Sequence, residues 1–585
     1  MGYKVDTMLT SAGHFTSRFL SKQLRVSVRR PTKVLEPRLT TSRRAFASFD
    51  DRESEKNKNA TLPPKLRKPP RTPTEVLINR AGLLPTRMHH GDDKRPPLEG
   101  LAKELEQMIM LNGPITVAEY MIYALQHPKH GYYMRPMDKI GRGGDFITAP
   151  EISQVFGEMI GIWCVATWNE MSNPAKVRLV ELGPGKGTLM KDILRAANSF
   201  PDFRKALTLH MVETSEDLKA LQVQALGATF APTASYSASR GGGGGGGAKE
   251  IADSAMRLPT GGEVFWHSKL EEVPKGDPTL VIGQEFLDAL PVHQFQYTAK
   301  GWRERLVDIT IPGAGEAEVG GEEITARAVE NDAAKPEMDA TGAAEDEDHR
   351  DEKNGKEEPD FRFVLSTEET AAVQTFLTKR DPKDVKLVMG GLRSSSGGGS
   401  SAGGGSRPAK SKTGPQGERV GDRLEVSGES ILLVKEVAER IAQDGGGALF
   451  IDYGEAHALE DSLRCFKGHQ EVSVLVDPGE ADMTADVNFG LLRRIVAGVE
   501  GARPHGPVGQ GQFLREMGIG ARLTALAEQP TVTDEQADAM LEGYVRLVDP
   551  EQMGKRYKVL GITEERQTMP PPGFMSEIDL DVRKD

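Results

Sequence analysis

The chain has 585 residues, with 86 Asp or Glu against 74 Lys or Arg, so its formal net charge is −12. Residues 316–360 contain 17 acidic and 5 basic residues, which is a net charge of −12 in this segment alone. The rest of the chain is therefore nearly neutral, and its charge does not indicate a nucleic-acid-binding protein. The two cysteines exclude a disulfide framework and a zinc cluster, and no apolar run reaches the roughly 18 residues of a membrane span.

The N-terminal segment differs in composition from the rest of the chain. Residues 1–49 contain ten basic and two acidic residues, many hydroxyl residues and no long apolar core. This composition is typical of a mitochondrial transit peptide, and the sequence around Arg43 and Arg44 resembles a processing site with cleavage after Phe46. We therefore expect residues 1–46 to be removed and residues 47–100 to form a disordered linker. A basic tail for nucleic acid is the alternative, but no basic patch interleaved with aromatics supports it.

The next segment contains histidines and a glycine-rich loop. His127, His130 and Asp138 lie close in sequence, but no cysteine or nearby carboxylate completes a ligand set, so no metal site is expected. Asp145 and Phe146 end the glycine-rich loop and are candidates for a wall of a substrate site. The alternative is a plain turn with a packed aromatic.

The most informative stretch runs from residue 177 to residue 194. Apolar residues end in Glu181, glycines follow at alternate positions, and a helical pattern of apolar residues comes next. This order predicts a buried strand, a turn that exposes backbone and a helix, as in nucleotide-binding α/β folds. A dinucleotide fingerprint would have its third glycine at position 188, where this chain has Thr188, which disfavours a nicotinamide oxidoreductase.

The glycine spacing instead resembles motif I of S-adenosylmethionine (SAM)-dependent methyltransferases. There the glycines let the backbone approach the amino-acid end and ribose of the cofactor. The resemblance implies that SAM binds at Glu181, Gly183, Gly185, Gly187 and Thr188. A glycine-rich turn that binds nothing is the alternative.

A second acidic residue is expected at the end of the next strand, where it would hold the ribose hydroxyls. Residues 206–212 form an apolar run that ends in Glu213, and Ser215 is placed to cap the following helix. Glu213 follows Gly187 by 26 residues, a spacing that fits a loop, a helix and a strand.

Two further strand ends carry acidic residues. The fourth strand, residues 280–284, is followed by Glu285 and Asp288, which a helical turn would place on one face. They are the candidate catalytic or substrate-clamping residues, the alternative being an acid pair that serves a helix dipole. The fifth strand, residues 448–451, ends in Asp452 and Tyr453, for which an ordinary turn is the favoured interpretation.

Several segments in chain order resemble the MidA family, whose mitochondrial members are protein-arginine methyltransferases of the NADH:ubiquinone oxidoreductase complex assembly factor 7 type. The segments are 113–125, 127–133, 144–158, 284–293, 301–304, 450–454, 482–489 and 506–514. The resemblance implies a class I SAM-methyltransferase α/β fold in a mitochondrial matrix enzyme. It further implies symmetric dimethylation of an arginine on a core peripheral-arm subunit of complex I, and action in complex I assembly. Gln284 departs from the Asn or His that is frequent in the family.

The resemblance also divides the chain. The expected methyltransferase parts are 101–312, 361–392 and 424–565, with the N-terminal helices and residues 455–515 forming a substrate-side elaboration. Residues 228–262 (glycine-rich), 313–360 (acidic) and 393–423 (Ser/Gly-rich) are expected to be disordered insertions, and 566–585 a tail.

Arginine chemistry makes specific demands on such a site. The guanidinium is protonated at physiological pH, so the site must bind a cation and accept a proton, and carboxylates do both. Rival functions are a SAM-binding assembly chaperone without activity and a methyltransferase for a small molecule. A homodimer is left open.

Overall fold

The computed structural model describes residues 98–134, 147–230, 255–310, 360–378, 418–567 and 569–575. Several predictions fall outside these residues: the transit peptide, nearly all of the linker, the candidate wall residues Asp145 and Phe146, and most of the three insertions. No helix in the described ranges is long and apolar enough to cross a membrane.

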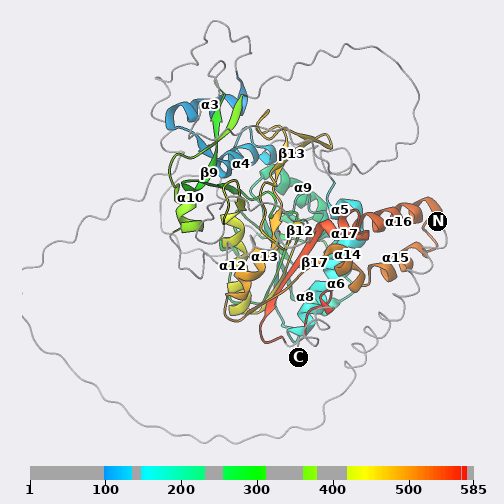
Figure 1. The fold of residues 1–585 in the computed structure, drawn as a ribbon. Helices are drawn as coiled ribbons and strands as arrows, with labels where there is room; N and C mark the ends of the chain where they lie inside the picture. The colour runs from blue at the N-terminus through cyan, green and yellow to red at the C-terminus, as the bar shows by residue number, and fades with distance from the viewer. Residues whose placement is uncertain are drawn as a thin grey trace, which may run out of the picture. The chain divides into compact units, whose positions relative to one another are not determined.

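A ten-stranded sheet forms the centre of the described structure (Figure 1). Five strands run parallel, and β18 pairs antiparallel with both β12 and β17 at one side. The short strand β16 (Val487–Asn488) adds to the end of β12. Across the sheet the order is β17 (Ala502–Gly509), β18 (Tyr557–Glu564), β12 (Gly446–Glu455), β7 (Thr279–Gln284), β2 (Val177–Leu182), β3 (Leu207–Val212), β6 (Glu263–His267), β5 (Met256–Arg257) and β4 (Thr229–Phe230).

Two apolar layers sandwich this sheet because successive side chains of each strand point to opposite faces. Leu179 packs with one layer and Val180 with the other, and both are fully buried. The first layer is built by helices α6 (Gln154–Glu170), α7 (Thr188–Ala197), α8 (Pro201–Ala206) and α9 (Glu216–Leu226), and the second by α12 (Gly428–Asp444) and α13 (Phe489–Ala497). The predicted strand–turn–helix unit and the predicted Ser215 cap are confirmed.

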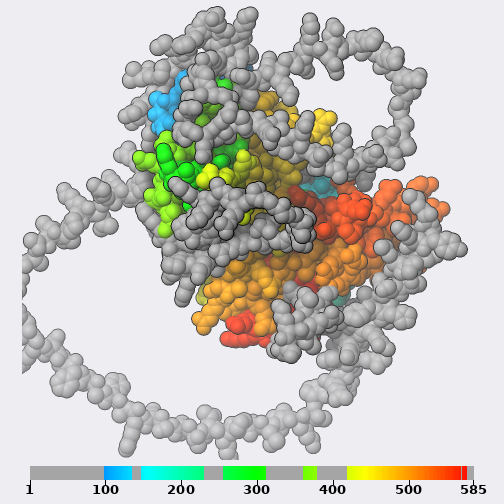
Figure 2. Space-filling view, in the orientation of Figure 1, coloured from blue at the N-terminus to red at the C-terminus, as the bar shows by residue number. Residues whose placement is uncertain are grey.

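A second, five-stranded antiparallel sheet lies in the other part of the described chain. Its strands are β1 (Ile115–Thr116), β8 (His293–Thr298), β9 (Gly301–Ile309), β10 (Phe361–Leu365) and β11 (Arg423–Val426), followed after β10 by α10 (Ala371–Val373). A small sheet is formed by β13 (Arg464–Lys467), β14 (Gln470–Val472) and β15 (Asp482–Thr484). Helices α3 (Gly100–Asn112) and α4 (Val117–Gln126), with the short helix η1 (Tyr132–Met134), share an apolar core with both sheets. In Figure 2 the surface of α3 (blue) lies next to a green surface, the colour of residues 255–310, with the yellow-green surface of residues 360–378 beyond it.

The position of residues 455–515 corrects one prediction. Only the β13–β15 part joins the N-terminal helices in the elaboration, whereas α13 and β17 belong to the central fold. The rest of the elaboration is formed by strands β8–β11, which follow β7 in the chain. Sequence order alone could not show this, because the chain leaves and re-enters the elaboration several times.

A helical insertion connects the last two strands of the central sheet. It consists of α14 (Gln510–Glu516), α15 (Ile519–Ala527), α16 (Asp534–Val548) and α17 (Met553–Arg556). Helix α15 packs on α6, and α16 packs on the short helix α5 (Ala149–Ile152), so the insertion reaches the carboxyl edge of the parallel strands.

Candidate active site

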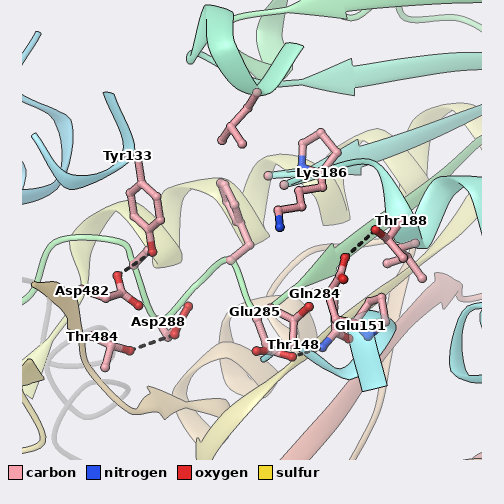
Figure 3. A pocket seen from close by; sticks show the side chains of 18 of the residues that line it. Tyr133, Thr148, Glu151, Lys186, Thr188, Gln284, Glu285, Asp288, Asp482 and Thr484 are labelled. Carbon is pink, nitrogen blue, oxygen red and sulfur yellow. Dashed lines mark hydrogen bonds between the residues drawn. The ribbon is translucent and has the colours of Figure 1, made fainter. Parts of the chain in front are cut away.

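A cavity of about 600 Å³ opens at the carboxyl ends of β2, β3, β7 and β12 (Figure 3). Open α/β sheets bind ligands at this edge because the loops after parallel strands converge there. The predicted site residues that line it are Glu181, Gly183, Gly185, Thr188, Glu213, Glu285 and Asp288. Gly187 does not line the cavity, and Asp145 and Phe146 lie outside the described residues.

The three glycines of the loop have positive φ, but for different reasons. Gly183 has φ +61° and a Cβ there would lie 2.4 Å from Phe286, so this glycine allows close packing. Gly185 has φ +51° and a Cβ would meet nothing within 4 Å, so its backbone faces the open cavity. Gly187 has φ +81° and packs against α9, where a Cβ would lie 3.3 Å from the backbone of Gln222. The positive φ favours glycine at all three positions, and only at Gly185 is the space beside the Cα open.

Glu181 and Glu213 place two buried carboxylates beside this loop. Glu181 is 2% exposed and its Oε2 has no hydrogen-bond partner. Burial, reinforced by Glu213, raises the pKa of Glu181 to about 8. Glu213 accepts from the backbone of Thr214 and Ser215 at 2.8 Å and from Gln222 at 3.2 Å, and burial raises its pKa. An orphaned carboxylate oxygen and a firmly held neighbour suit a ligand with an ammonium group and hydroxyl groups.

Thr188 lies at the start of α7 and contacts the N-terminal part of the fold. Its hydroxyl donates to Oε1 of Glu151 on α5 at 2.5 Å (Figure 3). Thr188 thus ties the glycine loop to the segment that forms the opposite wall.

Glu285 follows β7 in a left-handed conformation, with φ +48°. A non-glycine residue in this region is strained, and such strain gathers at functional sites. Its Oε1 accepts from the backbone N–H of Ala149 at 3.0 Å and from Gln284 at 2.8 Å. Burial, reinforced by the neighbouring Asp288, raises the pKa of Glu285 to about 7. The side chain is therefore poised to exchange a proton near neutral pH.

The segment after β7 is not the helical turn that the sequence predicted, because Asp452 organises it. Oδ2 of Asp452 accepts from the backbone N–H groups of Phe286, Leu287 and Asp288 at 3.1, 3.0 and 3.3 Å. Asp452 is 1% exposed, and burial next to Asp288 and Glu285 raises its pKa well above the usual range. The favoured interpretation of a turn at Asp452 and Tyr453 was wrong, because β12 continues through both residues.

Asp288 faces the same cavity and is held from two other elements. It accepts from the hydroxyl of Thr484 at 2.8 Å and from the hydroxyl of Tyr453 (Figure 3). Beside it the hydroxyl of Tyr133 donates to Asp482 at 2.8 Å. Burial raises the pKa of Asp288. The two acids that sequence spacing paired thus belong to a larger acidic wall with Asp482, while Asp452 is buried next to them outside the cavity lining.

Sequence reasoning missed Tyr133, Tyr453, Asp482 and Thr484 as cavity residues. They lie in segments that resemble the family, but Tyr133 and Asp482 are 349 positions apart. No spacing rule connects such residues; only the fold brings them together.

Gln284 has one unsatisfied acceptor. Its amide nitrogen donates to Glu285, while its Oε1 is buried without a partner and the residue lines the cavity. An orphaned acceptor at this place can receive an N–H from a ligand.

The two histidines of the N-terminal region lie by Glu104 on α3. His127 and His130 approach its carboxylate at 3.2 and 3.5 Å and stack on each other with centroids 5.3 Å apart. Within the ranges that the structure describes, no three potential metal-ligating side chains converge.

Known proteins share this sequence and fold. Residues 159–508 match the family Methyltransf_28, described as "Putative S-adenosyl-L-methionine-dependent methyltransferase". The chain is 32% identical over 496 residues to "Protein arginine methyltransferase NDUFAF7, mitochondrial" of Danio rerio, which covers 82% of this chain and 93% of that protein. It is 34% identical over 470 residues to the Drosophila melanogaster homologue, covering 79% and 84%, and 32% identical over 471 residues to the Homo sapiens protein, covering 80% and 84%.

A solved structure shares the fold. It is a COG1565 superfamily member from Burkholderia thailandensis bound to S-adenosyl-homocysteine, with a TM-score of 0.54 and 21% identity, covering 82% of this chain and 98% of that one. The fold is that of a class I SAM-dependent methyltransferase, as the sequence predicted. The chain belongs to the Methyltransf_28 family, and its resemblance to the mitochondrial members of the MidA family is confirmed.

Proposed function

We propose that the chain is a mitochondrial protein-arginine methyltransferase. The relatives are named for this activity and compartment. The observation that carries the proposal is the buried acidic wall around Glu285 and Asp288, which shares one cavity with the glycine loop. A site that is built from carboxylates fits a cationic methyl acceptor far better than a neutral one.

SAM would be held at the glycine-loop side of the cavity. The proposed binding groups are the backbone at Gly183 and Gly185, the carboxylates of Glu181 and Glu213, and the side chain of Thr188 at the start of α7. Glu181 has the orphaned oxygen that an ammonium group requires, and Gly185 leaves room for close approach. When bound, SAM supplies an electrophilic methyl group.

The acidic wall would bind the guanidinium and accept its proton. Both hydrogen bonds to Glu285 reach Oε1, which leaves Oε2 for substrate. With its pKa raised to about 7, Glu285 is partly protonated at neutral pH, and burial also raises the pKa values of the neighbouring Asp288 and Asp452. A guanidinium at the wall favours the ionised forms, because opposite charges stabilise each other in a poorly hydrated site. Glu285 then accepts a proton from the nitrogen that is methylated, and Asp288 holds the cation.

The finer assignment follows the family resemblance. We place the enzyme in the matrix, with symmetric dimethylation of an arginine on a core peripheral-arm subunit of complex I, in support of complex I assembly. The methyltransferase parts would be 101–312, 361–392 and 424–565, interrupted by the three dispensable insertions and preceded by a removable segment that ends at residue 46.

Incubation of the mature protein with labelled SAM and purified complex I subunits tests the proposal. Mass spectrometry should map symmetric dimethylarginine to one subunit, and Glu285→Gln should abolish it. A protein that binds SAM but labels no subunit would instead indicate an assembly chaperone. Label that appears only in small molecules would indicate a different acceptor.

A further inference from the structure

Two arginines on the cavity wall share a single buried carboxylate. Arg464 on β13 and Arg556 at the end of α17 lie 2.5 and 2.8 Å from the same oxygen, Oδ1 of Asp486. The Asp486 side chain is only 8% exposed, whereas Arg464 and Arg556 are 29% and 43% exposed. Both arginines line the cavity. Two positive charges thus meet one fixed negative charge, and the excess faces the substrate space.

Tyr453 joins this arginine pair to the acidic wall. The guanidinium carbons of Arg464 and Arg556 lie 5.7 and 5.9 Å from the centre of its ring, and its hydroxyl donates to Asp288. The arginine pair and the carboxylates are therefore about one tyrosine side chain apart. Arg546, on α16, also lines the cavity and favours ionisation of Glu285. We call Arg464, Arg546 and Arg556 the arginine rim.

An arginine rim is unfavourable for a substrate that carries only a guanidinium. Like charges repel, and the rim also weakens the attraction of the acidic wall for a cation. The arrangement becomes favourable if the substrate brings a negative group beside its arginine. Guanidinium groups bind carboxylates through paired, charge-assisted hydrogen bonds.

We infer that the arginine rim binds a carboxylate that the substrate carries next to its target arginine. This inference rests on the proposed function, and it adds the sequence context that the enzyme selects. A single carboxylate matches the pair of Arg464 and Arg556 better than a phosphate dianion, because Asp486 already neutralises one of their two positive charges. Consecutive residues of an extended chain are roughly 3.3–3.6 Å apart, so the carboxylate would come from Asp or Glu within about two residues of the arginine. The α-carboxylate of a C-terminal arginine is the other source.

Peptide binding measures the rim separately from turnover. Fluorescently labelled peptides with one central arginine would be titrated into the protein saturated with S-adenosylhomocysteine. One arm places Asp or Glu, and then the matching amide, at each of the two positions on either side. A second arm compares a C-terminal arginine with its carboxamide, and a third replaces the best acid with phosphoserine. We expect one acidic peptide to bind about tenfold more tightly than its amide, as expected when charge-assisted hydrogen bonds are lost.

Variants then assign the preference to the rim. Arg556→Gln and Arg464→Gln, made singly so that Asp486 keeps one partner, should reduce the acid-to-amide ratio to less than about threefold, while the amide peptide binds at least as tightly as before because one repelling charge is gone. Arg566→Gln is the matched control, because that side chain is 91% exposed and does not line the cavity. Equal binding of acidic and amide peptides, tighter binding of phosphoserine, or no binding of any peptide would overturn the inference.

Parallel methylation assays separate the two proposals. If peptides are methylated but show no preference for an acidic neighbour, the proposed function is supported and the inference about the arginine rim is wrong. An acid preference that the rim variants abolish, without methylation of any arginine, would support the rim and count against the proposed activity.

Discussion

The two halves of the cavity are built in different ways. The glycine-loop half comes from one continuous stretch, β2 to α7, with Glu213 from the adjacent strand β3. The acidic half gathers residues from five separate places: Tyr133, the turn after β7, the end of β12, β15 and the α14–α17 insertion. A binding surface that one supersecondary unit supplies can be recognised from local sequence, whereas a surface assembled across the fold cannot.

The largest effect is expected in the glycine-loop half. Gly185→Val should weaken SAM binding at least about 100-fold, because a branched side chain at positive φ is strained and fills space that faces the cavity. Calorimetry measures the loss, and far-UV circular dichroism should be unchanged. Gly183→Ala is the comparison: its Cβ would strike Phe286, so it should lower the melting temperature. Wild-type SAM affinity in Gly185→Val would remove the loop from the cofactor site.

In the acidic half, Glu285→Gln should lower methylation by roughly 100-fold or more with little change in SAM affinity. The variant keeps the shape and one acceptor but loses the charge that binds a guanidinium. Asp288→Asn should act in the same direction, and the double variant should lose less than the product of the two, since both residues serve one cation. Full turnover by Glu285→Gln at saturating SAM would separate the acidic wall from the chemistry.

Glu285 of the acidic wall should lower the free energy of unfolding as the pH rises. The pKa of Glu285 is about 7 in the fold, above its ordinary value of 4.5, so the folded state holds a proton that the unfolded chain releases. Its contribution therefore falls as pH rises from about 4.5 to about 7 and stays low above that range. Glu285→Gln should be more stable than wild type by about 3 kcal/mol at pH 8, several degrees in melting temperature, and nearly equal at pH 4.5. A pH-independent difference between the two proteins would contradict this origin.

The smallest effect is expected from the insertions, which lie outside the residues that the structure describes. Replacement of residues 316–359 or 393–417 by a short linker should change the melting temperature and SAM affinity very little, because their composition offers few apolar groups to bury. A loss of several degrees would show that the deleted segment packs on the methyltransferase parts.

The extent of sequence prediction follows the same division. Runs of apolar residues and the glycine spacing were sufficient to predict strands of the central sheet and the cavity position of Glu181 and Glu213. They could not show that Gly187 packs on α9 outside the cavity lining, or that Asp452 lies within a strand. The β8–β11 elaboration was also missed, because its strands are separated by long insertions and pair with the N-terminal segment.

The position of β18 in the central sheet determines when the fold can be completed during synthesis of the chain. This strand is formed by residues 557–564, yet it lies between β12 and β17 and pairs with both. Synthesis or translocation from the N-terminus therefore delivers one of the interior strands last, and until then β12 presents an open edge. A chain that stops before residue 557 lacks this strand and exposes the apolar layer beneath it, so we expect such fragments to aggregate or be degraded rather than to bind cofactor. The cavity can therefore be completed only after residues 557–564 have been added to the chain, since Tyr557 of β18 also lines it.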